Sequence, residues 1–395
     1  MLNLTHGNLV VVHGGGPTAV INASLYGAIQ EAKQYSEITG IYGAIGGVEG
    51  ILRGKFIDLK QVTTEAVRRL PCSPASALGT SRARLNPEDY ERIIQTLRKW
   101  KVKYLLFNGG NGSMDTCGKI YRLAKEYDIN VLGVPKTVDN DVAVTDHSPG
   151  FGSAARFIAA TTAEVAEDVK SMPIHVSIIE AMGRNAGWIA AASVLAQKKA
   201  EDAPHLIYLP ERPFKQDEFL EDVQDWRDRL GGVVVVVSEG LRDARGESIV
   251  PPLLTRGRDV YFGDVGTYLA TLVLKELGIK ARSEKPGLLG RASIPYQSST
   301  DRREAILAGA FSVQALLKGE TGKMVGFRRI SSRPYECEPV LIPLEKVMLH
   351  EKKLPDCFIN QRGNGVTEEF IEYCGPLIGE PLPTFVKLQE NGISD

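Results

Sequence analysis

One short segment of this chain combines a cation, a hydroxyl group and two carboxylates. It reads Pro135-Lys136-Thr137-Val138-Asp139-Asn140-Asp141. In an extended segment Asp139 and Asp141 lie on the same side, so one can accept a hydroxyl proton while the other helps to hold a metal ion. The segment follows an apolar run at residues 130–134, and open α/β sheets bind ligands at such strand ends. This composition indicates phosphoryl transfer, although Asp-Asn-Asp also suits a polar turn.

Three other turns join an apolar run to a predicted helix. They read His13-Gly14-Gly15-Gly16-Pro17-Thr18, Asn108-Gly109-Gly110-Asn111-Gly112-Ser113 and Glu180-Ala181-Met182-Gly183-Arg184. Glycine lets a backbone approach an anion closely, helix N-termini bind phosphate, and Arg184 could clamp a phosphate with two hydrogen bonds. Tight structural turns and a surface arginine are the alternatives. The first turn matches neither a Walker A loop nor the dinucleotide pattern.

A scaffold of alternating strands and helices must position these turns. Apolar, β-branched runs predict strands at residues 9–13, 103–107, 130–134, 174–180, 206–209 and 232–238. Amphipathic stretches predict helices at residues 19–35, 87–101, 113–127, 151–170 and 187–199. The alternation predicts an α/β protein with parallel sheets and crossover helices. After about residue 320 the pattern loosens into segments punctuated by proline.

Length and composition limit the class of protein. A chain of 395 residues has room for two α/β domains. Lys and Arg number 47 against 48 Asp and Glu, so there is no charge excess to indicate a nucleic-acid or membrane partner. The five cysteines show no metal-ligand spacing, which favours reduced thiols. No signal peptide or membrane-spanning run is recognisable, so we expect a soluble cytoplasmic protein.

The motifs, taken together, resemble the phosphofructokinase family of the two-domain α/β type, not the ribokinase-like type. The resemblance spans about residues 8–320. It rests on Gly15-Gly16 before Asn22, Leu78-Gly79-Thr80-Ser81-Arg82, Gly109-Gly110-Asn111-Gly112-Ser113, Lys136 to Asp141, Thr145-Asp146, Pro149-Gly150-Phe151-Gly152, Met182-Gly183-Arg184 and Ser238-Glu239-Gly240.

The resemblance implies two Rossmann-like, three-layer domains built on parallel sheets, with the active site between them. Residues 1–148 and about 290–345 would form the phosphoryl-donor domain. Residues 149–289 and about 346–395 would form the sugar-phosphate domain. The implied activity is transfer of a phosphoryl group to the 1-hydroxyl of fructose 6-phosphate, the glycolytic reaction that gives fructose 1,6-bisphosphate.

The resemblance also implies roles for individual residues. Asp139 is the expected base, with Asp141, Thr137, Lys136, Arg82 and Gly16 beside it in the catalytic group. The expected donor-binding residues are Gly15, Gly16, Arg82, Gly109, Gly110, Asn111, Gly112 and Ser113. The expected sugar-phosphate-binding residues are Thr137, Asp139, Met182, Gly183, Arg184, Glu239, Arg282 and Arg291. Arg282 is expected to reach a neighbouring subunit, which implies a homo-oligomer, either dimer or tetramer, with shared active sites.

Mg²⁺ is the implied cofactor, with Asp139 and Asp141 as ligands. Asn111 stands where many relatives have an aspartate near the metal, so its own role as a ligand is weaker because an amide oxygen carries no charge.

The sequence is compatible with either ATP or diphosphate as the phosphoryl donor. Diphosphate-dependent relatives usually have Asp at position 112 and Lys at position 136, and many ATP-dependent ones have Gly at both. Gly112 with Lys136 is a hybrid. We predict ATP because Gly112 leaves room for a nucleotide, and diphosphate is the alternative. Leu288 departs from the sugar-phosphate motif, so sedoheptulose 7-phosphate is a further candidate acceptor. An NAD-dependent oxidoreductase and a non-catalytic sugar-phosphate binder are distant alternatives.

Overall fold

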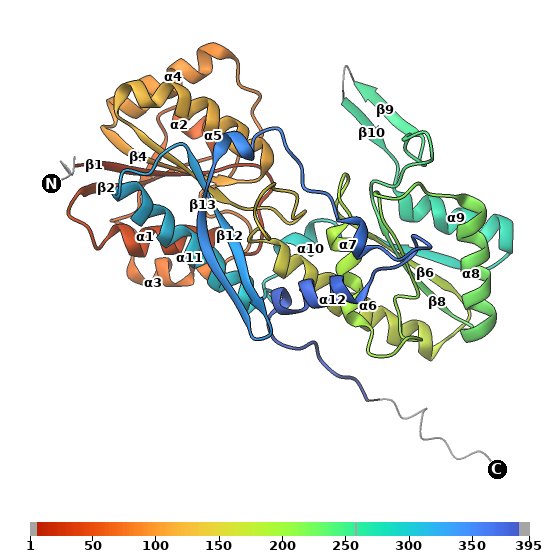
Figure 1. Cartoon of the computed structure of the whole chain (residues 1–395). Coiled ribbons are helices and arrows are strands. Elements are labelled where there is room, and N and C mark those ends of the chain that lie inside the picture. The colour runs from red at the N-terminus through yellow and green to blue at the C-terminus, as the bar shows by residue number, and fades with distance from the viewer. Residues whose placement is uncertain (1–5, 257–258, 387–395) are drawn as a thin grey trace.

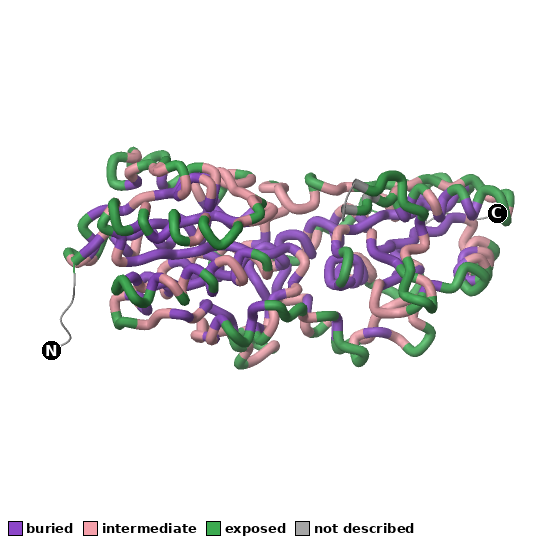
Figure 2. Tube along the Cα trace, turned by 90° about the horizontal axis from the view of Figure 1, so that it is seen from above, coloured by how far each residue is buried: buried purple, intermediate pink, exposed green. Residues whose placement is uncertain are grey.

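The computed structural model describes residues 6–256 and 259–386, which form two α/β bodies lying side by side (Figure 1). Each body is built around its own β-sheet. Buried segments run through the middle of both bodies, and exposed segments form their outer surfaces (Figure 2). Each body therefore has its own buried interior.

The first body contains a seven-stranded sheet in the order β13-β12-β5-β4-β1-β2-β3. Its strands are β1 (Gly7–His13), β2 (Ile38–Ala44), β3 (Phe56–Asp58), β4 (Val102–Gly109), β5 (Asn130–Pro135), β12 (Lys323–Ser332) and β13 (Tyr335–Pro343). The inner strands are parallel, whereas β3 and β13 pair antiparallel with their neighbours. The predicted α/β fold with parallel sheets is therefore confirmed, and the two edge strands add antiparallel pairs to this sheet.

Helices cover both faces of the first sheet. One face packs against α1 (Ile21–Ala32), α3 (Thr64–Arg69) and α11 (Ser299–Leu317). The opposite face packs against α2 (Val48–Leu52), α4 (Pro87–Lys99) and α5 (Asn111–Ala124). The strand residues alternate between the two cores: Val10 and Val12 face α2, α4 and α5, while Leu9 and Val11 face the other helices. This alternation is the period-two pattern of a sheet buried on both faces.

The second body contains a four-stranded parallel sheet in the order β11-β6-β8-β7. Its strands are β6 (Val176–Ala181), β7 (Leu206–Tyr208), β8 (Val233–Ser238) and β11 (Ala281–Glu284). One face packs against α6 (Phe151–Ser171), α7 (Trp188–Ala192) and α12 (Glu368–Cys374). The other face packs against α8 (Gln216–Leu230) and α9 (Val265–Leu277).

The remaining elements are short. The helix α10 (Leu288–Ala292) lies near the junction of the two bodies, and the hairpin of β9 (Pro252–Arg256) and β10 (Asp259–Phe262) projects from the second body (Figure 1). Single 3₁₀ turns occur at Leu70–Cys72, Lys125–Tyr127, Ser193–Ala196, Leu344–Lys346, Asp356–Phe358 and Gly375–Ile378.

The predicted strands and helices all appear, with shifted ends. The helix expected at residues 187–199 is the main exception, because α7 ends at Ala192 and continues as a 3₁₀ turn to Ala196. The segments after residue 320 that looked irregular form β12 and β13, a long antiparallel ladder. The exact domain boundaries remain a prediction. The C-terminal helix α12 does share a core with α6 and α7.

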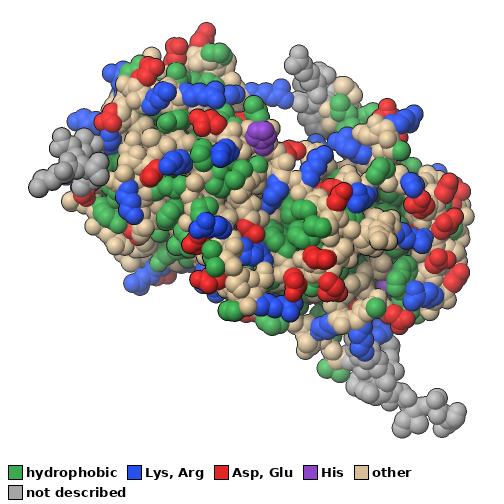
Figure 3. Space-filling view, in the orientation of Figure 1, with side chains coloured by type: hydrophobic (Ala, Val, Ile, Leu, Met, Phe, Trp, Pro, Cys, Tyr) green, Lys and Arg blue, Asp and Glu red, His purple; other side chains and the backbone are tan. Residues whose placement is uncertain are grey.

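Three further findings concern the surface charges, membrane-spanning helices and the thiols. Lysine and arginine are interspersed with aspartate and glutamate on the face shown in Figure 3, as a formal net charge of −1 suggests. Within the described part of the chain, no helix is long and apolar enough to cross a membrane. The five cysteines are free.

Candidate active site

The predicted turns meet because of the order of the strands. In the first sheet β1 lies between β4 and β2, so the chain leaves β1 toward one edge and later returns on its other side. Ligands bind at such a reversal, outside the carboxyl ends of the strands. His13 and Gly109 end the adjacent strands β1 and β4, and Pro135 ends the next strand, β5. All three loops therefore open toward one edge.

The second sheet contributes from the corresponding position. The chain passes from β6 to β7 and then inserts β8 between them, so the loops after β6 and β8 are neighbours. Met182 follows β6 and Glu239 follows β8. The Gly183 N–H points toward the Glu239 carboxylate, at 3.4 Å. The two sheets thus present their ligand-binding edges to each other.

A cleft of about 580 Å³ lies between these edges. Ligand sites typically have volumes of about 300–1,000 Å³. The cleft brings together most of the predicted site residues: Gly15, Gly16, Arg82, Gly110, Asn111, Gly112, Ser113, Lys136, Thr137, Asp139, Asp141, Met182, Glu239 and Arg291. The cleft does not include Gly109, Gly183, Arg184 or Arg282 in its lining.

The four residues outside the cleft lining have different surroundings. Gly109 lies under the second turn, where a Cβ atom would meet the Ser113 hydroxyl at 2.2 Å. Gly183 has a φ of +119°, a conformation that favours glycine. Arg184 and Arg282 are exposed. Of the three arginines expected to bind the sugar phosphate, Arg291 thus lines the cleft and Arg184 and Arg282 do not.

The Thr137 hydroxyl group connects the two residues that carry the carboxylates. Thr137 Oγ1 donates to Asp141 Oδ1 at 3.0 Å and accepts from the Asp139 N–H at 3.1 Å. Burial raises the pKa of Asp139 to about 7, and the nearby charges of Asp141 and Glu239 add to that shift. A general base works best when its pKa is close to the working pH. Asp139 therefore has the electrostatic setting of a base at neutral pH.

The cations of the cleft gather around the first glycine turn. Lys136 is buried, and its ammonium group donates to the Gly16 carbonyl at 2.5 Å. Burial lowers the pKa of Lys136 to about 8, while Asp139 acts in the opposite direction. A Cβ atom on Gly16 would lie 2.8 Å from Arg291 Nη1 and 3.4 Å from Arg82 Nη2. Glycine at position 16 therefore allows both guanidinium groups to approach the backbone.

Asn111 and Asp141 form the part of the cleft that fits a metal ion. Asn111 Nδ2 donates to the Asp141 carbonyl at 3.0 Å and to Asp141 Oδ2 at 2.9 Å. Asn111 Oδ1 is buried and has no hydrogen-bond partner among the described residues. Mg²⁺ prefers oxygen ligands such as carboxylates. The free amide oxygen beside the Asp141 carboxylate matches that preference.

Glu351 is a residue of the cleft that the sequence reasoning missed. It lines the cleft and accepts from Asn185 Nδ2, with both carboxylate oxygens at 3.2 Å. Glu351 forms an isolated antiparallel bridge with Val142. Its surrounding sequence, His350-Glu351-Lys352-Lys353, looks like an exposed polar loop. No local signal could have placed it in the site.

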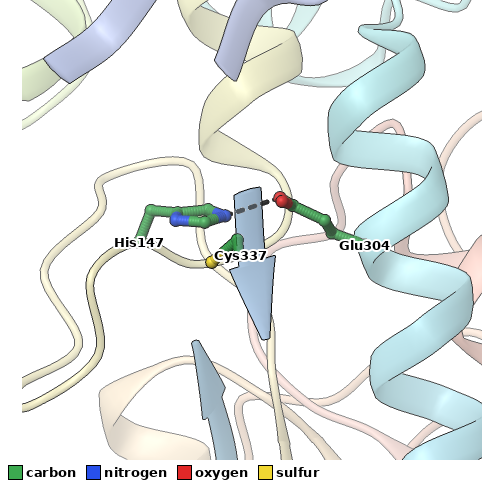
Figure 4. Close-up of side chains that lie close together, drawn as sticks. All are labelled: His147, Glu304 and Cys337. Carbon is green, nitrogen blue, oxygen red and sulfur yellow. Dashed lines mark hydrogen bonds and ion pairs between the residues drawn. The ribbon is translucent and has the colours of Figure 1, made fainter. Parts of the chain in front are cut away.

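A second group of possible metal ligands lies outside the cleft (Figure 4). His147, Glu304 and Cys337 could contribute one ligand atom each. His147 Nε2 is 2.6 Å from Glu304 Oε2, and its Nδ1 is 2.9 Å from Asp146 Oδ2. These carboxylates raise the pKa of His147 to about 9 despite its burial. Both ring nitrogens of His147 are already bound by carboxylates, so we interpret the group as a buried ion network.

Comparisons with known proteins agree with this geometry. A family model described as Phosphofructokinase matches residues 8–316. A pyrophosphate–fructose 6-phosphate 1-phosphotransferase of Xanthomonas campestris is 39% identical, over 99% of this chain and 98% of the relative. A sulfofructose kinase of Alkalicoccus urumqiensis is 33% identical, over 90% and 92%. The crystal structure of a pyrophosphate-dependent phosphofructokinase from Marinobacter aquaeolei has a TM-score of 0.87 at 36% identity, covering 96% of this chain and 94% of that one.

Proposed function

This chain belongs to the phosphofructokinase family, and we propose that it transfers a phosphoryl group from diphosphate to the 1-hydroxyl of fructose 6-phosphate. The observation that carries the proposal is the pairing, in one cleft, of a buried lysine with a half-buried aspartate of raised pKa. Lys136 faces the anion-binding glycine turn, and Asp139 lies two peptide units beyond Thr137 in the same loop.

The residues of the cleft have different roles in the reaction. Asp139 takes the proton from the sugar hydroxyl as that oxygen attacks the phosphorus atom. Lys136, Arg82 and Arg291 surround the oxygens of the transferred and leaving phosphates. A loose phosphoryl transition state gains mainly from such positioning and charge neutralisation. The N–H groups of the glycine turns add further donors at the entry of α5.

Mg²⁺ fits the same cleft. Asp141 and Asn111 would hold it, with Asp139 close by, and the remaining ligands would be phosphate oxygens and water. The ion, when bound, neutralises charge on the donor and on the leaving phosphate.

Diphosphate replaces ATP as the favoured donor. We predicted ATP from Gly112, and a Cβ atom at that position would indeed meet nothing within 4 Å. Open space permits a nucleotide but does not attract one. Lys136 provides a buried charge beside the donor turn, and the names of the Xanthomonas and Marinobacter proteins support diphosphate.

The donor can be tested with the purified protein, fructose 6-phosphate and Mg²⁺. Diphosphate should support turnover and ATP should support little or none. Gly112→Asp should leave diphosphate activity within about tenfold, because the new carboxylate projects into open space, and should abolish any remaining ATP activity. Turnover with ATP alone would refute the choice of donor.

The acceptor has a second candidate. Arg184 and Arg282, two of the three arginines expected to bind the sugar phosphate, are exposed, and the Alkalicoccus relative is named for sulfofructose. A sulfonate is an anion with a single negative charge, so it needs fewer cations than a phosphate. Fructose 6-phosphate, sedoheptulose 7-phosphate and sulfofructose should be compared by kcat/KM. We expect fructose 6-phosphate to have the highest value.

Self-association is part of the proposal. Arg282 is exposed on β11, an edge strand of the second sheet. From that position it could reach another copy of the chain. Light scattering on the eluting protein should give a mass of at least two chains, compared with 43.1 kDa for one.

A further inference from the structure

The loop that carries the two carboxylates cannot hold its shape through its own backbone. It comprises residues 137–146, here called the acidic loop, and contains no helix or named strand. Asn140 has a φ of +51° and Val144 a φ of +69°. A β-branched residue such as valine is rarely found there, and such conformations cost about 1–3 kcal/mol each. They persist only where surrounding groups impose them.

A segment from the C-terminal part of the chain supplies those groups. Residues 347–354, here called the strap, pass from one body to the other. Val347 and Met348 are buried in the core of the first body, and Leu354 is buried in the core of the second. The strap lies beyond residue 316, where the match to the family model ends.

Lys352 is the point of closest attachment between the strap and the acidic loop. Its backbone N–H donates to the Asp141 carbonyl at 2.8 Å. Its ammonium group donates to the Asp146 carbonyl at 2.7 Å, the Thr145 carbonyl at 3.1 Å and Asn140 Oδ1 at 3.3 Å. A single side chain thus fixes both ends of the turn that follows Asp139. Lys352 itself does not line the cleft, so it can support the loop without being part of the cleft lining.

Tyr373 holds the same turn from α12. Asn140 Nδ2 donates to the Tyr373 hydroxyl at 2.9 Å, and that hydroxyl donates to the Asp146 carbonyl at 2.7 Å. Asn140 Oδ1 also accepts from the Ser148 N–H at 3.1 Å. All hydrogen-bonding atoms of the Asn140 side chain therefore serve to keep this residue in its left-handed conformation.

The strap is itself fixed to the second body. Trp188 Nε1 donates to the Lys352 carbonyl at 3.2 Å, and the Lys352 ammonium lies 4.9 Å from the centre of a Trp188 ring. A cation over an aromatic face is attracted to it. Trp188 begins α7, just after the loop that contains Met182 and Asn185. Lys352 thereby links the loop of the expected base to the loop of the expected sugar site.

We propose that Lys352 and Tyr373 are positioning residues, which hold the acidic loop so that Asp139 and Asp141 keep the geometry needed for phosphoryl transfer. The expected change in kcat rests on the proposed function, whereas the expected change in hydrogen exchange does not. Misplacing a catalytic group by about 1 Å can cost about 100-fold in rate.

The test compares Lys352→Met with a neighbouring control, Lys353→Met. Lys353 is exposed and adjacent in sequence. Lys352→Met should lower kcat about 10- to 100-fold and change KM for fructose 6-phosphate by less than about threefold. Amide hydrogen exchange in residues 137–146 should become faster. Lys353→Met should change neither quantity, and Lys352→Arg should restore part of the rate by keeping hydrogen-bond donors in place.

Tyr373→Phe provides the second variant, should Lys352→Met fail to fold. It removes only one hydroxyl group and should also accelerate exchange in the acidic loop while lowering kcat. Unchanged exchange in both variants would overturn the inference, and so would faster exchange with an unchanged kcat. Exchange is measured without substrate, so absence of turnover in the wild-type protein would refute the proposed function and leave the loop measurement valid.

Discussion

At the scale of single residues, the cleft places two groups with oppositely shifted pKa values in one loop. Burial raises the pKa of Asp139 to about 7 and lowers that of Lys136 to about 8. Both shifts have the same cause, because burial disfavours the charged form of either group. The base and the cation are both in their active form only in the narrow range between these values.

The pH dependence of kcat/KM should therefore be bell-shaped. Activity should rise as Asp139 loses its proton near pH 7 and should fall as Lys136 loses its charge above about pH 8. Initial rates at low substrate concentration from pH 5 to 10 would measure the curve. Lys136→Arg should shift the alkaline limb to higher pH, since a guanidinium group stays charged. An unchanged alkaline limb would mean that another group causes it.

Asp139→Ser tests the assignment of the base. Loss of a positioned base should lower kcat by about 10²- to 10⁴-fold, whereas binding of fructose 6-phosphate, measured by calorimetry, should persist. Glu345 is an exposed acidic residue outside the cleft lining, and Glu345→Gln serves as the control. Near wild-type turnover of Asp139→Ser would show that the assignment is wrong.

At the scale of elements, two glycines decide how closely α1 and α11 pack. A Cβ atom on Gly309 would lie 2.0 Å from the Ser24 carbonyl oxygen, and one on Gly27 would lie 2.0 Å from the Ile306 carbonyl oxygen. The two helix backbones are therefore in direct contact, beneath the sheet that carries the donor turns.

Gly309→Ala should destabilise the protein by about 1–3 kcal/mol, the usual cost of overpacking. This outweighs the gain of up to about 1 kcal/mol that alanine brings to a helix. Gly375→Ala is the matched control, because a Cβ atom there meets nothing within 4 Å. Urea denaturation would compare them, and equal stability of the two variants would refute the close contact.

The ion network behind the acidic loop should make stability depend on pH. The folded-state pKa of His147 is raised to about 9 from an ordinary value of 6.5. Its contribution is therefore complete below pH 6.5 and is lost as the pH rises toward 9. His147→Gln leaves the Glu304 carboxylate without its cation, whereas Asp146 keeps its ion pair with Arg329. The substitution should cost about 3–5 kcal/mol at pH 6 and less at pH 9. An equal loss at both values would show that His147 is uncharged.

At the scale of the whole molecule, the cleft lies between two bodies that carry different parts of the site. The donor turns and the acidic loop follow strands of the first sheet, whereas Met182 and Glu239 follow strands of the second. Relative movement of the bodies would open or close the cleft, and closure excludes water from the transferred group.

Binding of both substrates should therefore make the molecule more compact. Small-angle scattering should show a smaller radius of gyration with fructose 6-phosphate and a non-transferable diphosphate analogue than without ligand. Indistinguishable curves would count against closure. Fructose 6-phosphate alone is the control, and it should produce a smaller change because one body alone is then engaged.

The sequence alone was sufficient for the family, the α/β class and most of the cleft residues. These follow from contiguous motifs, because a strand end, a glycine turn and a helix start occupy neighbouring positions in the chain. The residue types at those positions indicate the chemistry directly. The strands β12 and β13 were missed because prolines obscured an antiparallel ladder. The donor was also misjudged, because empty space at Gly112 carries no preference by itself.

Only the tertiary structure decided which distant segments support the acidic loop. Lys352 and Tyr373 lie more than two hundred residues from Asn140 in sequence, yet both bind it. It also placed Glu351 in the cleft and left Arg184 and Arg282 outside its lining. The physical reason is that long-range contacts depend on strand order and on the path of the chain between the two bodies. The local pattern of residue types determines neither of these features.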